Sequence, residues 1–173
     1  MLKGAESGGI VLVPVDLSAQ SEAAVVVASE LVGSAFDGLL ILHVVHEAGD
    51  GAGFYRSRDD SGQLTAIPEI AANLLSRFVG QMRRRYPALT ALKQARAVTV
   101  AGLPCRTIQD VAEREGAGLI VMASRKRSVL GRLLRPSVSE RVVRASRSPV
   151  VLVTGAPAPN RSLRAPTELH AVS

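Results

Sequence analysis

Five short strand-like segments, four of them apolar runs rich in valine, isoleucine or leucine, are spaced along this chain with helix-like segments between them. They cover residues 10–15, 39–45, 95–100, 119–122 and 149–153. A run of four to eight apolar residues without polar alternation is typical of a strand that is buried on both faces of a parallel sheet. This spacing restricts the chain to an α/β fold in which a crossover helix follows each strand but the last.

The segments between the runs have helical periodicity. A first helix is predicted over residues 19–32, a third after Pro104 and a fourth over 137–145. The second is predicted to end near residues 86–87, and apolar side chains recur every four residues along it at Ile70, Leu74, Phe78 and Met82. The pattern predicts an open, Rossmann-like parallel sheet with helices on both faces. Ligands of such sheets bind beyond the carboxyl ends of the strands.

Three segments do not fit this periodicity. Residues 47–65 are rich in Gly, Asp, Ser and Arg, which predicts a long exposed loop. We expect residues 1–8 to be flexible and residues 155–173 to form a disordered tail. The folded domain is therefore predicted to span residues 9–154, a length that suits one domain with a sizeable core.

Cysteine content and hydropathy indicate the cellular compartment in which the protein is expected. The chain has one cysteine, Cys105, which excludes an intrachain disulfide and fits a reducing environment. The first residues show no apolar leader, and no apolar run approaches the 18 or so residues that a membrane span needs. We expect a cytoplasmic protein that does not contact a membrane.

The positive charge is concentrated in one segment. The net charge is +6, whereas residues 125–147 alone hold eight basic side chains and one acidic one. Such a segment is compatible with binding to nucleic acid. Aromatic residues make up only 3% of the chain, so no stacking platform accompanies the charge and we do not favour nucleic acid as a partner.

Two polar features stand where the fold predicts a ligand. Asp16 follows the first strand, where its carboxylate can accept hydrogen bonds from a ligand, cap the first helix, or do both. Ser137 and Glu140 have the spacing of a capping box, which directs the first-turn amides of Val138 and Ser139 toward whatever lies before the helix. Free amides and the helix dipole attract phosphate, although an ordinary helix cap has the same sequence.

Other candidate residues are weaker evidence for a functional site. Arg125 and Lys126 belong to a basic loop that either clamps phosphates or is simply solvated. His43 and His46 are three positions apart on one strand, so they point to opposite faces and predict no metal site. Neither a P-loop nor a dinucleotide-binding glycine motif is present. No residue set predicts catalysis.

Taken together, the segments at residues 10–18, 40–44, 98–124 and 137–153 resemble a universal stress protein domain. The resemblance covers nearly the whole predicted domain. It implies a five-stranded parallel sheet in the order 3-2-1-4-5. It also implies a homodimer, often formed between fifth strands, for which the apolar segment bounded by Val150 and Val153 is the counterpart here.

One branch of that family binds ATP or another adenine nucleotide and carries the motif G-x2-G-x9-G-[S/T] after strand 4. The motif positions fall on Ala123, Lys126, Pro136 and Ser137, so the spacing and the serine are kept while all three glycines are replaced. A residue other than glycine is strained where φ is positive, and proline has no amide to donate. The remaining family pocket positions match at Pro14, Val15, Asp16, Val44, Met122 and Val138.

Two functions follow from the resemblance. We favour a dimeric stress-response module that binds ATP, ADP or AMP at the carboxyl ends of strands 1 and 4, with Mg²⁺ only as the companion of the nucleotide. The alternative is a nucleotide-independent interaction protein whose phosphate loop has lost its ligand. Slow ATP hydrolysis is compatible with the family resemblance, but no base can be assigned here and we expect no enzyme.

Overall fold

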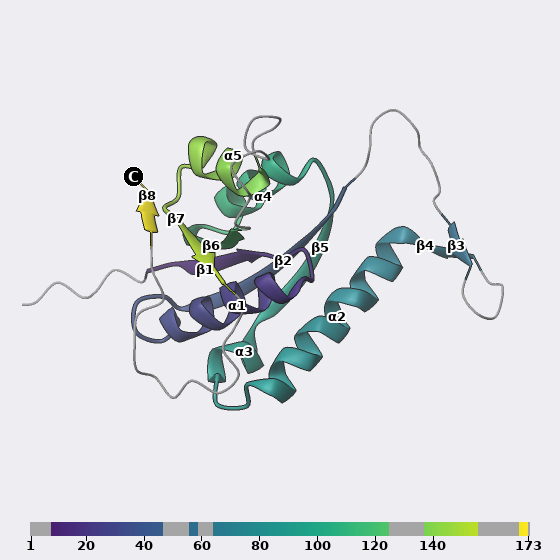
Figure 1. Cartoon of the computed structure of the whole chain (residues 1–173), viewed down its shortest axis with the longest axis horizontal. Helices are drawn as coiled ribbons and strands as arrows, with labels where there is room; N and C mark the ends of the chain where they lie inside the picture. Colours follow the sequence, from purple (N-terminus) through teal and green to yellow (C-terminus); the bar gives the residue numbers. More distant parts are fainter. Residues whose placement is uncertain (1–7, 47–55, 59–63, 125–136, 156–169, 173) are drawn as a thin grey trace, which may run out of the picture.

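The computed structural model describes residues 8–46, 56–58, 64–124, 137–155 and 170–172. Its strands are β1 (Ile10–Pro14), β2 (Gly38–His46), β3 (Arg56–Arg58), β4 (Leu64–Ala66), β5 (Arg96–Gly102), β6 (Ala117–Ser124), β7 (Val150–Thr154) and β8 (His170–Val172). Its helices are α1 (Ala19–Leu31), α2 (Ile67–Arg85), α3 (Thr90–Gln94), α4 (Pro104–Arg114) and α5 (Val138–Ala145). The elements form an α/β fold around one main sheet (Figure 1).

The main sheet contains the five predicted strands in the predicted order. Its strand order is β5-β2-β1-β6-β7, which is 3-2-1-4-5 when the five predicted strands are counted along the chain, and all four pairings are parallel. β1 lies at the centre, where Leu12 is in register with Leu40 of β2 and Ile120 of β6. The order reverses at β1, so the sheet has its topological switch point beside the end of that strand.

A sixth strand extends this sheet beyond β7. β8 pairs with β7 in antiparallel orientation, with Val150 in register with Val172 and Leu152 in register with His170. The prediction of a disordered tail was therefore wrong for residues 170–172. Residues 156–169 and 173, like residues 1–7 at the other end, lie outside the described residues.

The core has two halves, one on each face of the sheet. Val11 and Val13 of β1 point toward α1, α2 and α3, whereas Leu12 points toward α4 and α5. All three side chains are fully buried, as expected for successive residues of a strand that is covered on both faces. Figure 1 shows the two groups of helices on opposite sides of the sheet.

Some local predictions differ from the structure. Leu74 of α2 is 46% exposed, and the buried face of that helix instead consists of Ala71, Leu75, Phe78, Val79 and Met82. This face follows the i, i+4, i+7, i+8, i+11 pattern, which rotates less around the helix than a strict repeat of four. Within the segment predicted as a loop, β3 pairs with β4 in a small antiparallel sheet. The short helix α3 was not predicted. No helix among the described residues is long and apolar enough to cross a membrane.

Candidate functional site

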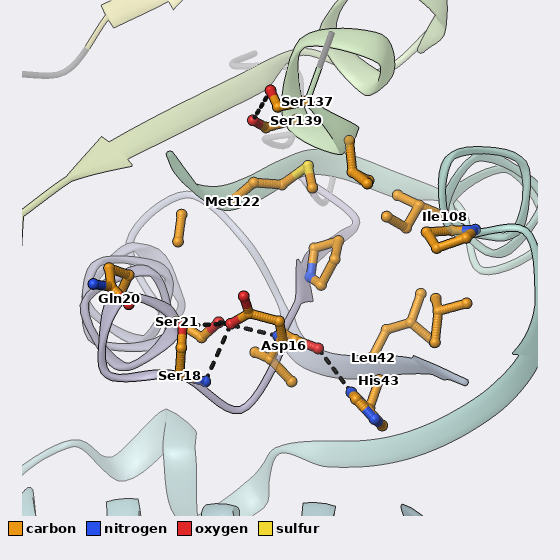
Figure 2. Close-up of a pocket in the computed structure, with 16 residues that line it drawn as sticks. Asp16, Ser18, Gln20, Ser21, Leu42, His43, Ile108, Met122, Ser137 and Ser139 are labelled. Atoms are coloured by element: carbon orange, nitrogen blue, oxygen red, sulfur yellow. Dashed lines mark hydrogen bonds between the residues drawn. The ribbon is translucent and has the colours of Figure 1, made fainter. Parts of the chain in front are cut away.

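A cavity of about 370 Å³ opens at the carboxyl ends of β1, β2 and β6 (Figure 2). This volume lies in the range of small-molecule sites. The cavity is at the switch point of the sheet, where α1 and α5, the helices that come next after β1 and β6, lie on opposite faces. Its described lining residues are Pro14, Val15, Asp16, Ser18, Gln20, Ser21, Leu42, His43, Val44, Pro104, Ile108, Met122, Ala123, Ser137, Val138 and Ser139.

One end of the cavity is formed by the turn that joins β1 to α1. The Asp16 Oδ1 atom accepts hydrogen bonds from the Ser18 amide at 3.1 Å, from the Ser18 hydroxyl, and from the Ser21 hydroxyl at 2.6 Å. The Asp16 amide in turn donates to the Ser21 Oγ atom at 3.1 Å. A side chain that accepts from the amide two residues on forms a tight turn, and here the turn holds Leu17 at a φ of 62°. Asp16 therefore fixes the shape of this rim through its bonds to Ser18 and Ser21.

The opposite end of the cavity is the start of α5. Ser137 is the N-cap residue, its Oγ atom accepts from the Glu140 amide at 3.2 Å, and the Glu140 carboxylate accepts from the Ser137 amide at 2.8 Å. The predicted capping box is thus confirmed. It uses the amide of Glu140, while the amides of Ser139 and Val138, one and two positions earlier, have no acceptor within the helix. Figure 2 shows Ser137 and Ser139 across the cavity from Asp16, with Met122 between them.

The wall between the two ends is apolar. Leu42 and Met122 are buried in the sheet, Val44 is half-buried near the end of β2, and Ile108 comes from α4. An apolar wall with polar groups at both ends suits a ligand that has a flat ring at its centre and polar or charged groups at its periphery. No lysine or arginine is found among the described residues that line the cavity.

His43 helps to hold the ends of β1 and β2 together. Its Nδ1 atom lies 2.9 Å from the Val15 carbonyl oxygen, and the Val15 amide donates to the Leu42 carbonyl oxygen at 2.8 Å. Because a carbonyl oxygen only accepts, Nδ1 of His43 carries a proton. Within the described part of the chain, no three His, Cys, Asp or Glu side chains are grouped closely enough to hold a metal ion.

The comparison with family models assigns the chain to a known family. The model of the universal stress protein family matches residues 9–154, which include every strand of the parallel sheet and the whole described lining of the cavity. The chain belongs to the universal stress protein family.

Solved universal stress proteins have the same fold. One, a universal stress protein in complex with cAMP, is 22% identical with a TM-score of 0.64, and the match covers 84% of this chain and 96% of that one. A protein of this family from Burkholderia pseudomallei is 25% identical with a TM-score of 0.54, covering 84% and 95%. A third, from Archaeoglobus fulgidus in complex with dAMP, is 21% identical with a TM-score of 0.50, covering 83% and 96%. No match was found among curated proteins.

The structure brings most of the residues singled out in the sequence into this one cavity. Those that line it are Pro14, Val15, Asp16, Val44, Met122, Ala123, Ser137, Val138 and Ser139. Arg125, Lys126 and Pro136 lie outside the described residues. Among the described residues other than glycine, only Leu17 has a positive φ, so the alanine at position 123 is not strained by replacing the first family glycine.

Seven lining residues were not predicted. They are Ser18, Gln20, Ser21, Leu42, His43, Pro104 and Ile108. The serines follow the first strand closely, and their small polar side chains were a signal for a structured turn at that point. Pro104 and Ile108 could not be placed from local patterns, because α4 reaches the cavity only through the strand order that sets β2 beside β1.

Proposed function

We propose that this universal stress protein binds an adenine nucleotide in the cavity at the carboxyl ends of β1 and β6. The observation that carries the proposal is that the matched base-side residues and the start of α5 line one cavity. The solved family members in complex with cAMP and dAMP support this choice of ligand class.

The chemistry of the cavity suggests how the ligand lies. The adenine ring packs between the apolar side chains of Val44, Met122 and Ile108, which bury its faces. The phosphates approach the start of α5, where the amides of Val138 and Ser139 and the positive end of the helix dipole stabilise negative charge. Glu140 reduces this attraction, although its carboxylate is held back by the Ser137 amide.

Cations from the adjoining basic loop complete the phosphate site in this proposal. The described lining supplies amides and hydroxyls but no cationic side chain. Arg125 and Lys126 directly follow β6, which ends at Ser124 beside the cavity. Each charge-assisted hydrogen bond to phosphate contributes about 1.5–3 kcal/mol, so two such side chains are enough to replace the donors lost with the family glycines.

A nucleotide-independent interaction protein is the second candidate. The observation that favours it is the replacement of the second and third motif glycines by Lys126 and Pro136. Pro136 lacks an amide, so at least one phosphate donor of the family loop is absent. Under this candidate the cavity persists as part of the scaffold, and the protein acts through a macromolecular partner.

Analysis of the gently purified protein tests the two candidates. The protein is denatured and the released small molecules are identified by mass spectrometry, and the empty protein is then titrated calorimetrically with ATP, ADP, AMP and cAMP. We expect a dissociation constant well below about 1 mM for at least one of them, and weaker binding of GTP. Binding weaker than millimolar for all four would defeat the proposal and favour the second candidate.

A matched pair of variants on β2 tests whether the nucleotide binds in this cavity. Val44 and Val45 are both half-buried, but they are consecutive on the strand and point to opposite faces, and only Val44 lines the cavity. Val44→Phe fills part of the cavity and should abolish nucleotide binding, whereas Val45→Phe should leave it intact. Circular dichroism of both variants checks that each remains folded.

The remaining functional expectations belong to the same proposal. We propose binding without turnover, with Mg²⁺ only on the nucleotide, in a cytoplasmic protein. Release of inorganic phosphate from ATP at a rate proportional to protein concentration would contradict the expectation that no enzyme is present. A dimer formed through β7 is also proposed, and β8 bears directly on it.

A further inference from the structure

The outer edge of β7 is occupied by a strand of the same chain. On its inner side β7 pairs with β6, from Ile120 with Val150 to Ser124 with Thr154. On its outer side three of its five residues are in register with β8. Figure 1 shows β8 next to β7 at the margin of the sheet.

β8 lies outside the family domain. The family model ends at residue 154, the last residue of β7, whereas β8 begins at His170. The domain without this strand would end in an apolar edge strand of sequence VVLVT. Such an edge presents unpaired amides and carbonyls that readily pair with another chain.

The orientation of β8 matches that of a second copy of β7. When two identical strands pair across a two-fold axis perpendicular to the sheet, they run antiparallel. β8 also runs antiparallel to β7. A strand edge holds one neighbour at a time, so β8 and the β7 strand of another protomer exclude each other at this edge.

We propose that β8 is an intramolecular competitor of dimerisation, which keeps the β7 edge closed in the monomer and must leave before two protomers pair through it. The partner that the edge accepts when β8 is displaced is a second copy of this chain. This proposal rests on the dimer through β7 that is proposed above, and it does not depend on nucleotide binding.

At a two-fold interface, competition by β8 raises the dimer dissociation constant twice over, once for each protomer. A covalently linked strand acts at an effective concentration on the order of millimolar, far above the concentration of a second protomer in a dilute solution. If β8 is docked in about nine chains of ten, only about one tenth of the protomers are competent. The dimer dissociation constant then rises about 100-fold, because both protomers must release β8.

The test compares full-length chains that differ only at the strand. Replacing His170, Ala171 and Val172 by glycine removes the strand propensity without changing the length of the chain. Deletion of Ser173 alone is the matched control, because it keeps β8. Sedimentation velocity over a micromolar concentration series measures the equilibrium between the 18.2 kDa monomer and the dimer.

We expect the glycine variant to dimerise at least about tenfold more tightly than the wild type, and the control to match the wild type. Equal dissociation constants for wild type and variant, or a variant that stays monomeric, would overturn the proposal. Open-ended aggregates in place of a dimer would also overturn it, because the edge would then pair without two-fold closure. A chain truncated after Gly155 gives an independent second variant, for which the same outcomes apply.

Hydrogen exchange on β7 provides a readout that does not rely on the oligomer. In the dilute wild type, the outward-facing amides of β7 should exchange slowly, because β8 covers them. In the dilute glycine variant they should exchange rapidly, and they should become protected again as the concentration rises. Equal exchange in dilute wild type and dilute variant would mean that β8 does not close the edge.

Discussion

Replacing Val138 by proline removes one proposed phosphate donor while leaving helix α5 in place. Val138 is the first helical residue after the N-cap Ser137, a position where proline is favoured because the amide has no acceptor in the helix. Proline also restricts the residue before it to extended backbone, and Ser137 already has φ −66° and ψ 162°. We therefore expect the Val138→Pro variant to unfold at nearly the wild-type temperature.

Loss of the Val138 amide should weaken the binding only of ligands that carry phosphate. A hydrogen bond to a charged group contributes about 1.5–3 kcal/mol, so ATP should bind about 10- to 100-fold more weakly. Adenosine, which has no phosphate, should bind wild type and variant alike. Val138→Ala is the matched control, because it shortens the same side chain, which is 39% exposed, but keeps the amide.

Calorimetric titration of the wild type and both variants with ATP and adenosine measures these affinities. The reasoning is refuted if proline and alanine weaken ATP binding equally, since the amide would then contribute nothing. It is also refuted if proline weakens ATP and adenosine binding by the same factor, because the site would have changed shape instead of losing a phosphate donor.

Three further predictions concern stability. Ser21→Ala removes a buried hydroxyl that donates to the carboxylate at the end of β1, and urea unfolding should show a loss of about 1–3 kcal/mol. Leu75→Ala should cost about 2–5 kcal/mol, whereas the neighbouring Leu74→Ala should change the free energy of unfolding by no more than about 0.5 kcal/mol; equal effects would show that the helix face is misassigned. The hydrogen bond from Arg96 lowers the pKa of Glu115, so its stabilising contribution is present above the ordinary carboxyl pKa and is lost as the pH falls through the lowered one. Glu115→Gln should therefore be less stable than the wild type at neutral pH and should lose less stability on acidification, which thermal unfolding across acidic pH measures.

The strand pattern of the sequence was sufficient to predict the parallel sheet. The central residues of β1 and β6 are covered on both faces, so they are apolar and stand out from the helices between the strands. The α5 start was equally predictable, because a capping box depends only on residues three positions apart. Local rules of this kind operate within a few residues and need no tertiary context.

Features that depend on tertiary context were predicted less well. The exposed position of Leu74 reflects how α2 is rotated against the sheet, which a strict repeat of four residues does not determine. β8 has only three residues and forms strand structure because it meets the β7 edge, so its own sequence carries little signal. Ile108 reaches the cavity from α4 because of the strand order, which no local motif encodes.

The central claim is that adenine nucleotides bind between the end of β1 and the start of α5. The most direct measurement is an amide-resolved NMR titration of the ¹⁵N-labelled protein with ATP. The account predicts saturable shifts at Asp16, Val44, Val138 and Ser139, which line the cavity from three different elements. Absence of shifts at millimolar ATP, or shifts confined to the separate cavity between α2 and β5 around Ser76 and Thr99, would contradict it.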